Sequence, residues 1–192
     1  IYLSMIIWLA SYPKSGNTWL RFFILSLLVG KTTDVNLSHL KAILAYPHST
    51  HFKDLVSDLF DLDEIAKNWI NSQKKVNSNK HLRFFKTHNM LGNYKGYPFT
   101  NADNTLGAIY VVRDPRNVIT SLKNHYSLSN YIEAKEFLFD ENKILAMSER
   151  QKKIFMKSKI FPLKQFVGSW KTNYLSWKHM SYNYLLVKYE DL

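Results

Sequence analysis

The feature that most constrains the fold of this chain is a short loop that joins a buried strand to an apolar helix. Residues 5–11 form an almost continuous apolar run, which predicts a buried strand that ends at a proline turn. Residues 17–29 are also strongly apolar and are followed by Gly30, the usual residue after the end of a helix. The loop and its flanks read Ser11-Tyr12-Pro13-Lys14-Ser15-Gly16-Asn17-Thr18-Trp19.

This loop has the chemistry of an anion-binding site. Backbone N–H groups at the beginning of a helix are unpaired, and the helix dipole adds positive potential there. Gly16 lets a ligand approach the backbone, Lys14 adds a positive charge, and Ser15 and Thr18 add hydroxyl donors. The nucleotide triphosphatase pattern G-x-x-x-x-G-K-S/T is different, because here the lysine precedes the only glycine. Lys-Ser-Gly alone is more typical of an ordinary junction with a surface lysine, and only the full string favours a phosphate site.

The remaining segments predict strands that alternate with helices. The clearest buried strand is at residues 108–112, and a helix follows it with Asp114 as N-cap and Pro115 in the first turn. This alternation predicts an α/β fold, a three-layer α/β/α domain with a mostly parallel central sheet, and the length suits a single domain over residues 1–192. The other predicted elements are helices at 37–44, 52–74 and 163–180, further helices within 132–159, strands at 81–87 and 184–189, and a loop at 91–104.

The composition excludes several classes of chemistry. The chain has no cysteine, which excludes disulfides, thiolate nucleophiles and cysteine metal sites, and a cytoplasmic location is expected. No apolar run reaches the ~18 residues that a membrane span needs, and residues 1–10 lack the basic beginning of a signal peptide. The histidines offer no convincing ligand set, so no metal is expected. The net charge of +11 favours anions, and nucleic acid, an anionic membrane or a phosphorylated small molecule would all fit it.

The string Tyr-Pro-Lys-Ser-Gly-Asn-Thr-Trp resembles the 5′-phosphosulfate loop of sulfotransferases that use 3′-phosphoadenosine 5′-phosphosulfate (PAPS). Asparagine replaces the more familiar first threonine, a variant associated with bacterial members. The resemblance implies a P-loop NTPase-like sulfotransferase fold, in which Lys14 contacts the 5′-phosphate and the bridging oxygen. Trp19 would stack on the adenine, whereas core packing would explain a tryptophan seen alone. The implied phosphate cradle, made of amides and hydroxyls, is Ser15, Gly16, Asn17 and Thr18.

A second segment is similar to the 3′-phosphate site of the same family. Arg113 comes directly after the strand at residues 108–112, and Ser121 follows eight positions later, which is the family's spacing. The end of a strand and the first turns of the next helix can meet at the carboxyl edge of a sheet, where α/β proteins bind ligands. An arginine suits phosphate because its planar guanidinium offers two donors. Arg116 is a weaker candidate, since an exposed helix charge explains it better.

A third segment, Phe85-Lys86-Thr87-His88, resembles the family's catalytic lysine and histidine, which are two positions apart. By this resemblance His88 is the general base that takes the acceptor proton, and Lys86 stabilises charge on the transferring sulfuryl group. A lone histidine after a strand is more often structural, so the assignment depends on the other two segments. Gly168-Ser169-Trp170 and Tyr189-Glu-Asp-Leu192 also match the family, and Tyr189 would reach the adenine.

The chain also departs from the family pattern at its two ends. Family members continue past the Tyr-Glu-Asp strand into a basic-glycine segment that completes the 3′-phosphate site, whereas this sequence stops at Leu192. We therefore expect a domain that lacks the C-terminal part of the family domain, with weakened PAPS binding and uncertain activity. Met5 resembles a natural start, so residues 1–4 would be upstream read-through.

The resemblance predicts transfer of a sulfuryl group from the co-substrate PAPS to an acceptor hydroxyl or amine, on a small molecule or a glycan, without a metal. Two alternatives remain: a P-loop-like nucleotide kinase or hydrolase, for which the G-K-S/T loop and a magnesium-binding acidic strand end are missing, and a basic polyanion-binding domain. Scattered lysines argue against the second alternative, so no nucleic-acid partner is expected. The acceptor and the oligomeric state are not predicted. An acceptor pocket is expected from loops at 45–52, 91–104 and 127–150, with the aromatic residues Tyr46, Tyr94, Tyr97 and Phe99.

Overall fold

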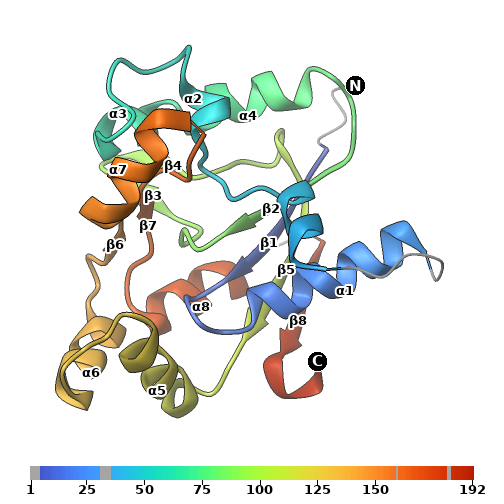
Figure 1. Cartoon of the computed structure of the whole chain (residues 1–192). Helices are drawn as coiled ribbons and strands as arrows, with labels where there is room; N and C mark the ends of the chain where they lie inside the picture. The colour runs from blue at the N-terminus through green and yellow to red at the C-terminus, as the bar shows by residue number, and fades with distance from the viewer. Residues whose placement is uncertain (1–4, 31–35, 159, 181–182) are drawn as a thin grey trace.

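The computed structural model of the chain describes residues 5–30, 36–158, 160–180 and 183–192. Strands and helices alternate along most of this length (Figure 1). In chain order the elements are β1 (Ile6–Ser11), α1 (Asn17–Val29), the 3-10 helix η1 (Leu37–Ala42), α2 (Ser49–Phe52), α3 (Leu62–Lys67), α4 (Trp69–Asn77), β2 (Arg83–Thr87), β3 (Asn93–Tyr94), β4 (Tyr97–Pro98), β5 (Thr105–Val112), α5 (Pro115–His125), α6 (Tyr131–Phe139), β6 (Ile144–Leu145), α7 (Glu149–Ser158), β7 (Gln165–Phe166), α8 (Trp170–Lys178), β8 (Tyr184–Lys188) and η2 (Tyr189–Asp191).

A four-stranded parallel sheet in the order β2-β1-β5-β8 forms the centre of the molecule. Ala10 of β1 pairs with Thr87 of β2 on one side and with Tyr110 of β5 on the other. Val112 at the end of β5 pairs with Lys188 at the end of β8. All four strands therefore finish at the same edge of the sheet, which is where α/β proteins bind ligands. The predicted α/β/α architecture with a parallel sheet is confirmed.

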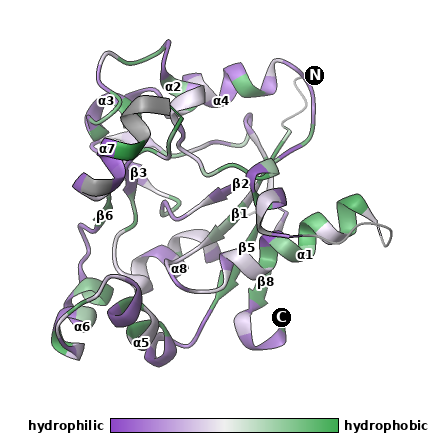
Figure 2. Cartoon of the chain, viewed as in Figure 1, coloured by the Kyte–Doolittle hydropathy of each residue, from purple (hydrophilic) through white to green (hydrophobic). Residues whose placement is uncertain are grey.

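Helices cover both faces of this sheet, and each face has its own hydrophobic cluster. On one face Leu9 and Val111 pack against Leu20 and Ile24 of α1. On the other face the fully buried Trp8 contacts a large aromatic cluster and donates a hydrogen bond from Nε1 to Thr105 Oγ1 (2.9 Å). α1 also has exposed apolar side chains, among them Phe23, Leu27 and Leu28, and most of the helix has the hydrophobic colour in Figure 2. The buried members of the aromatic cluster include Tyr46, Phe52, Trp69, Phe85, Phe99 and Trp177.

The elements that were predicted from the strongest local patterns are confirmed. β1 and α1 begin and end within one residue of the predicted bounds, and Gly30 follows α1. Asp114 caps α5 by accepting a hydrogen bond from the N–H of Arg116 (2.8 Å), and Pro115 is in the first turn. The predicted strand at 184–189 ends one residue early, because Tyr189 begins η2.

The prediction of one helix at 52–74 is wrong. The segment contains the end of α2, an irregular turn, α3 and the first part of α4. Side chains end the helical pattern locally: Glu64 accepts hydrogen bonds from the N–H and hydroxyl of Ser57 (2.7 and 2.6 Å). Asp61 caps α3 by accepting from the N–H of Asp63 (2.8 Å). Short polar side chains such as that of Asp61 compete with the helix for backbone groups.

Two other predicted elements need correction, and two predictions concern residues that the structure does not describe. The helix predicted at 163–180 begins only at Trp170, because β7 pairs with β6 before it and Ser169 forms the N-cap. The loop predicted at 91–104 contains the small hairpin β3–β4, which turns at Lys95 and Gly96, both with positive φ. Residues 1–4, which were expected to be read-through, and residue 159, at the end of a predicted helix, lie outside the described residues.

Candidate functional site

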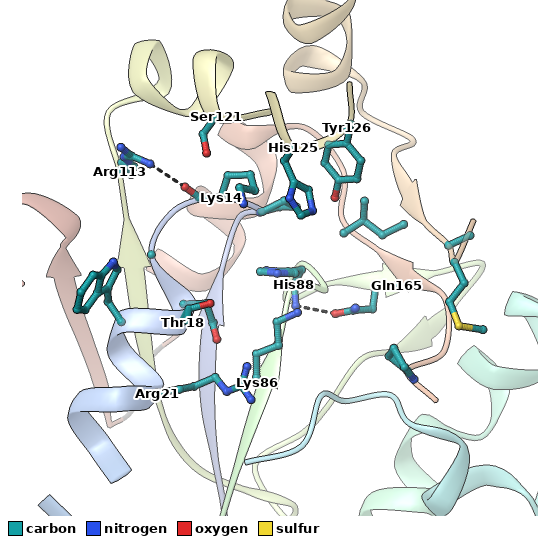
Figure 3. Close-up of a pocket in the computed structure, with 18 of the residues that line it drawn as sticks. Lys14, Thr18, Arg21, Lys86, His88, Arg113, Ser121, His125, Tyr126 and Gln165 are labelled. Atoms are coloured by element: carbon teal, nitrogen blue, oxygen red, sulfur yellow. Dashed lines mark hydrogen bonds between the residues drawn. The ribbon is translucent and has the colours of Figure 1, made fainter. Parts of the chain in front are cut away.

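A cavity of about 560 Å³ lies at the carboxyl edge of the sheet. It collects residues from three segments that the sequence placed at strand ends, namely the β1–α1 loop, the end of β2 and the beginning of α5 (Figure 3). Ten of the eleven predicted site residues line it; Ser15 is the exception. Those ten are Lys14, Gly16, Asn17, Thr18, Trp19, Lys86, His88, Arg113, Ser121 and Tyr189.

The β1–α1 loop presents unpaired backbone amides to this cavity. The N–H of Ser15 closes a tight turn on Tyr12 O (3.2 Å), and the first bond of α1 runs from the N–H of Leu20 to Gly16 O (3.2 Å). The amides between these two bonds precede the regular helix pattern, so they are available to an anion. Lys14 has a φ of 66° and Gly16 a φ of 106°, so two left-handed residues shape the loop.

Gly16 is required for a second reason, which is the close approach of Tyr189. A Cβ atom on Gly16 would lie 2.3 Å from Cδ2 of the Tyr189 ring. The end of β8 therefore packs directly on the loop that follows β1. The Ser15 hydroxyl is buried, and the Asn17 side chain, which lines the cavity, is bound to β1: its Nδ2 donates to Leu9 O (2.9 Å) and Ser11 Oγ (3.2 Å). These contacts anchor the loop on β1.

Arg113 connects the end of β5 to both of these segments. Its Nη1 donates to Lys14 O (3.2 Å), and its guanidinium lies 4.2 Å from the centre of the Tyr189 ring, a cation–π contact. Its Nε is buried and has no hydrogen-bond partner among the described residues. Ser121, two turns along α5, lines the same part of the cavity (Figure 3). An anionic ligand in the cavity could accept a hydrogen bond from this buried, unpaired donor.

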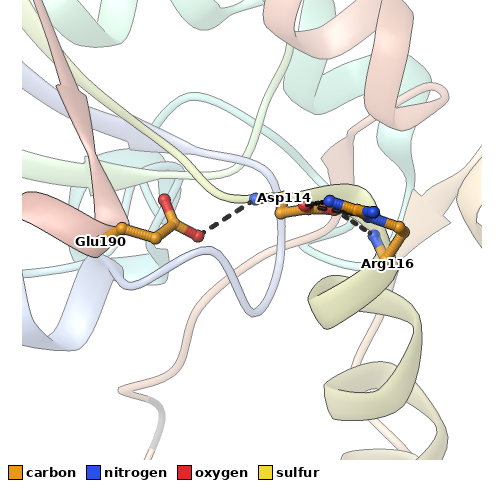
Figure 4. Close-up of polar contacts among 3 residues, drawn as sticks. All are labelled: Asp114, Arg116 and Glu190. Carbon is orange, nitrogen blue, oxygen red and sulfur yellow. Dashed lines mark hydrogen bonds and ion pairs between the residues drawn. The ribbon is translucent and has the colours of Figure 1, made fainter.

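Arg116 lies outside the cavity, as expected for a surface charge. Its guanidinium folds back onto Asp114, with Nη2 2.5 Å from Oδ2, and its side chain is 88% exposed. The N–H of Asp114 in turn donates a long hydrogen bond to Glu190 Oε1 (3.5 Å), as Figure 4 shows. Asp114 and Glu190 thus join the end of β5 to η2 next to the Arg113–Tyr189 contact.

His88 is held so that one ring nitrogen remains free. Its Nδ1 lies 2.7 Å from Ser11 O, and a carbonyl oxygen can only accept, so Nδ1 carries the proton and Nε2 keeps a lone pair in the neutral ring. The backbone of His88 is fixed by Gln165 Oε1, which accepts from its N–H (2.7 Å), and by Asn173 Nδ2, which donates to its carbonyl (3.0 Å). Burial, followed by the charge of Lys86, lowers the pKa of His88 well below 6.5.

The cations of the cavity lower one another's proton affinity. Burial and then the charge of Arg21 lower the pKa of Lys86 to about 7, and burial and then Arg113 lower the pKa of Lys14. No Asp or Glu is found among the described residues that line the cavity. The site is therefore a concentrated positive field without an internal counter-charge, which favours a multiply charged anion.

Sequence reasoning missed several lining residues, and three of them carry titratable side chains. Arg21 lies one turn beyond Asn17 on α1. The spacing of four residues places both on the same face of the helix, so the sequence could have indicated Arg21. His125 and Tyr126 come at the end of α5, one turn after Ser121. Burial and the charge of Lys14 lower the pKa of His125. Spacing along α5 could have indicated His125.

The end of the cavity beyond His88 differs from the expected acceptor pocket. Tyr46 and Phe99, which were expected to line it, are fully buried in the aromatic cluster, so that prediction is wrong. Tyr94 and Tyr97 belong to the β3–β4 hairpin and are not lining residues either. The actual wall comes from segments around β6 and β7: Leu145, Ala146, Met147, Gln151, Pro162, Leu163 and Gln165. Of the three expected loops, only 127–150 contributes lining residues beyond His88.

Other kinds of site are not found in the described part of the chain. No group of three or more His, Asp or Glu side chains could hold a metal ion there. Among the same residues, no helix combines the length and apolarity that crossing a bilayer requires.

Comparison with protein families decides the identity of the domain. The family model described as "Sulfotransferase domain" matches residues 5–192. The chain belongs to this sulfotransferase family. No curated protein sequence matches it.

Solved structures resemble the sulfotransferase domain at low sequence identity. A crystal structure of mouse sulfotransferase SULT7A1 complexed with PAP is 19% identical, with a TM-score of 0.51, and the match covers 97% of this chain and 52% of that protein. Retinol dehydratase in a complex with retinol and PAP is 18% identical, with a TM-score of 0.48, and the match covers 98% of this chain and 56% of that protein. The chain thus spans about half of the length of these structures, and the first match supports the α/β sulfotransferase fold.

Proposed function

We propose that this sulfotransferase domain binds PAPS in the described cavity and transfers its sulfuryl group to an acceptor hydroxyl or amine. The observation that carries the proposal is the arrangement around one cavity of a free imidazole nitrogen, four lysine and arginine side chains and a helix N-terminus. PAPS would supply the sulfuryl group, and its bisphosphate part would be the leaving group. That SULT7A1 was crystallised with PAP is consistent with this choice of ligand.

The nucleotide end of the cavity fits the two phosphates of PAPS. The amides at the beginning of α1, together with Lys14 and Thr18, would hold the 5′-phosphate. Arg113, with its unpaired Nε, and Ser121 would hold the 3′-phosphate. Trp19, which is 62% exposed, and Tyr189 offer aromatic surface to the adenine.

The chemical step follows from the state of His88. With its proton on Nδ1 and shared with Ser11 O, the ring can accept the acceptor's proton at Nε2, and the Ser11 carbonyl then stabilises the imidazolium. Because the pKa of His88 is low in the free site, the ring is neutral and ready to act as a base at neutral pH. Lys14 and Lys86 would balance the charge on the sulfuryl oxygens.

The test is a comparison of two nucleotides by calorimetry. The native chain should bind 3′,5′-bisphosphoadenosine more tightly than adenosine 5′-monophosphate, by about tenfold to a hundredfold for a charged hydrogen-bond set. Arg113→Ala should abolish this difference, Lys14→Ala should weaken both nucleotides, and Arg116→Ala is the matched control. Equal binding of the two nucleotides by the native chain would contradict the 3′-phosphate assignment. If ATP with magnesium stabilised the chain and 3′,5′-bisphosphoadenosine did not, a nucleotide kinase or hydrolase would be favoured instead.

A further inference from the structure

Arg21 is a cation in the cavity that the proposed transfer mechanism does not use. It projects from α1 and is half-buried beside Lys86 (Figure 3). Its Nη2 donates to Leu40 O (2.5 Å) and to Ile43 O (3.1 Å), both at the end of η1. Among the described residues it forms no ion pair, and its Nε is buried without a partner. Arg21 thus keeps a full charge that no carboxylate neutralises.

The segment that Arg21 holds is the one that fixes the backbone of Lys86. After Ile43 the chain runs alongside β2: the N–H of Lys86 donates to Leu44 O (2.9 Å), and the N–H of Tyr46 donates to Lys86 O (2.8 Å). Ala45 forms an isolated parallel bridge with Lys86. The guanidinium of Arg21 is therefore connected through two carbonyl groups and a short stretch of chain to both backbone groups of Lys86.

Among the described residues that line the cavity around Lys86, the charged groups are all positive. The charge of Arg21 is the second cause, after burial, of the low pKa of Lys86, and it also lowers the pKa of His88. The other titratable side chains that line the cavity lie in, or directly next to, α1, β2, β5, α5 and η2. None of them is a carboxylate: Arg21, Lys14, His88, Arg113, His125, Tyr126 and Tyr189.

We propose that Arg21 is a positioning residue that acts through Lys86: it holds the segment that aligns Lys86 and places a permanent positive charge beside the Lys86 amine. This inference rests on the proposed function, in which Lys86 faces the sulfuryl group. The consequence is that Lys86 is only partly protonated in the free site and becomes fully charged when an anion enters. Lys86 thus takes up its proton when the anionic donor binds. In the free site, repulsion from the neighbouring cations keeps the Lys86 amine only partly protonated.

The experiment measures the titration of the Lys86 amine without any need for transfer activity. The native chain, Arg21→Gln, Arg21→Lys and the control Lys74→Gln are labelled with acetic anhydride across a pH series, and the Lys86 peptide is quantified by mass spectrometry. Lys74 is exposed on α4 and outside the cavity, so the control removes one positive charge elsewhere. Because no nucleotide or acceptor is present, the result is independent of whether PAPS is the donor.

We expect a labelling midpoint near pH 7 in the native chain, since the pKa of Lys86 is about 7. Arg21→Gln should raise the midpoint by roughly half a unit to one unit, because one repulsive charge is removed while burial remains. Arg21→Lys keeps the charge and should leave the midpoint within a few tenths of the native value, as should Lys74→Gln.

Two outcomes would overturn the proposal. One is an unchanged midpoint in Arg21→Gln, which would mean that Arg21 does not act on the Lys86 amine. The other is an equal upward shift in Arg21→Gln and Arg21→Lys together with a lower unfolding temperature, which would show a purely structural role. If Arg21→Gln does not fold, a large upward shift in folded Arg21→Lys would overturn the proposal in the same way.

Discussion

The two ends of the cavity are built in different ways. The end proposed to bind the nucleotide, called the nucleotide end below, is made of a continuous loop, residues 14–19, and of side chains that directly follow strand ends, such as Arg113. The acceptor end is made of residues around two two-residue strands, β6 and β7, and of the last turn of α5. The first is rich in cations and backbone amides, whereas the second combines apolar side chains with a few polar ones, namely His125, Tyr126, Gln151 and Gln165.

This difference matches the two kinds of recognition that the proposed function requires. An anionic nucleotide needs fixed charges and amides at set positions, and a strand–loop–helix junction provides them by backbone geometry. A wall of apolar side chains on short strands imposes shape but little charge, so it can vary without disturbing the nucleotide end. His88 lies between the two ends, and its contacts reach both: Ser11 on the nucleotide side and Gln165 on the other.

The largest expected effect comes from removing the imidazole at this junction. His88→Ala should lower kcat for sulfuryl transfer from PAPS to simple phenols by about 10²- to 10⁴-fold, the usual contribution of a general base. Binding of 3′,5′-bisphosphoadenosine, measured by calorimetry, should change little. His125→Ala is the control, because this imidazole lines the same cavity without the Ser11 contact. A comparable loss in His125→Ala would contradict the assignment of the base.

A second prediction tests whether the nucleotide end depends on Tyr189, which directly follows β8. Gly16→Ala should lower the free energy of unfolding by about 2 kcal/mol and weaken nucleotide binding, because the residue has a left-handed φ and a Cβ would overlap Tyr189. Gly30→Ala is a matched control with a φ of 80° and nothing within 4 Å. The double variant Gly16→Ala/Tyr189→Ala should recover part of the loss in urea unfolding. Equal losses at Gly16 and Gly30 would mean that the Tyr189 contact adds nothing.

The third prediction concerns pH. The pKa of His88 in the folded, unliganded chain lies well below its ordinary value of 6.5, so the proposed base is protonated only at a lower pH than a free histidine. The acidic limb of the kcat/KM profile should therefore have its midpoint below 6.5 and then fall about tenfold per pH unit. His125→Gln should leave this limb in place. A midpoint at or above 6.5 would show that burial and the nearby cations do not together lower the pKa of the base.

The smallest effect is expected at the acceptor end. Met147→Ala removes apolar surface from the wall of the cavity and should raise the acceptor KM only a few-fold, since a single apolar contact is worth about 1 kcal/mol or slightly more. Nucleotide binding by the same variant should equal that of the native chain in calorimetry. Weaker nucleotide binding in Met147→Ala would break the distinction between the two ends.

The same distinction explains what could be predicted from the sequence. β1, α1 and the cap of α5 follow from local patterns, and the three motifs that predicted Lys14, His88 and Arg113 come from strand ends that a parallel sheet must bring together. The acceptor wall could not be found in this way, because two-residue strands such as β6 leave no periodic pattern. Tyr46 and Phe99 were assigned to this wall for being aromatic, yet the aromatic cluster around Trp8 buries them. Arg21 was overlooked because the sequence motif ends before it.

The contact of Tyr189 with Gly16 has a consequence for the order in which the domain is assembled. The loop proposed to hold the 5′-phosphate is made early in synthesis, whereas the ring that packs on it belongs to a segment that emerges much later. Contacts between such distant parts of a chain form late, because loop closure must precede them. A growing polypeptide would therefore possess α1 and its dipole long before it has a finished nucleotide site, and ligand binding should become measurable only after the ribosome has released residue 189.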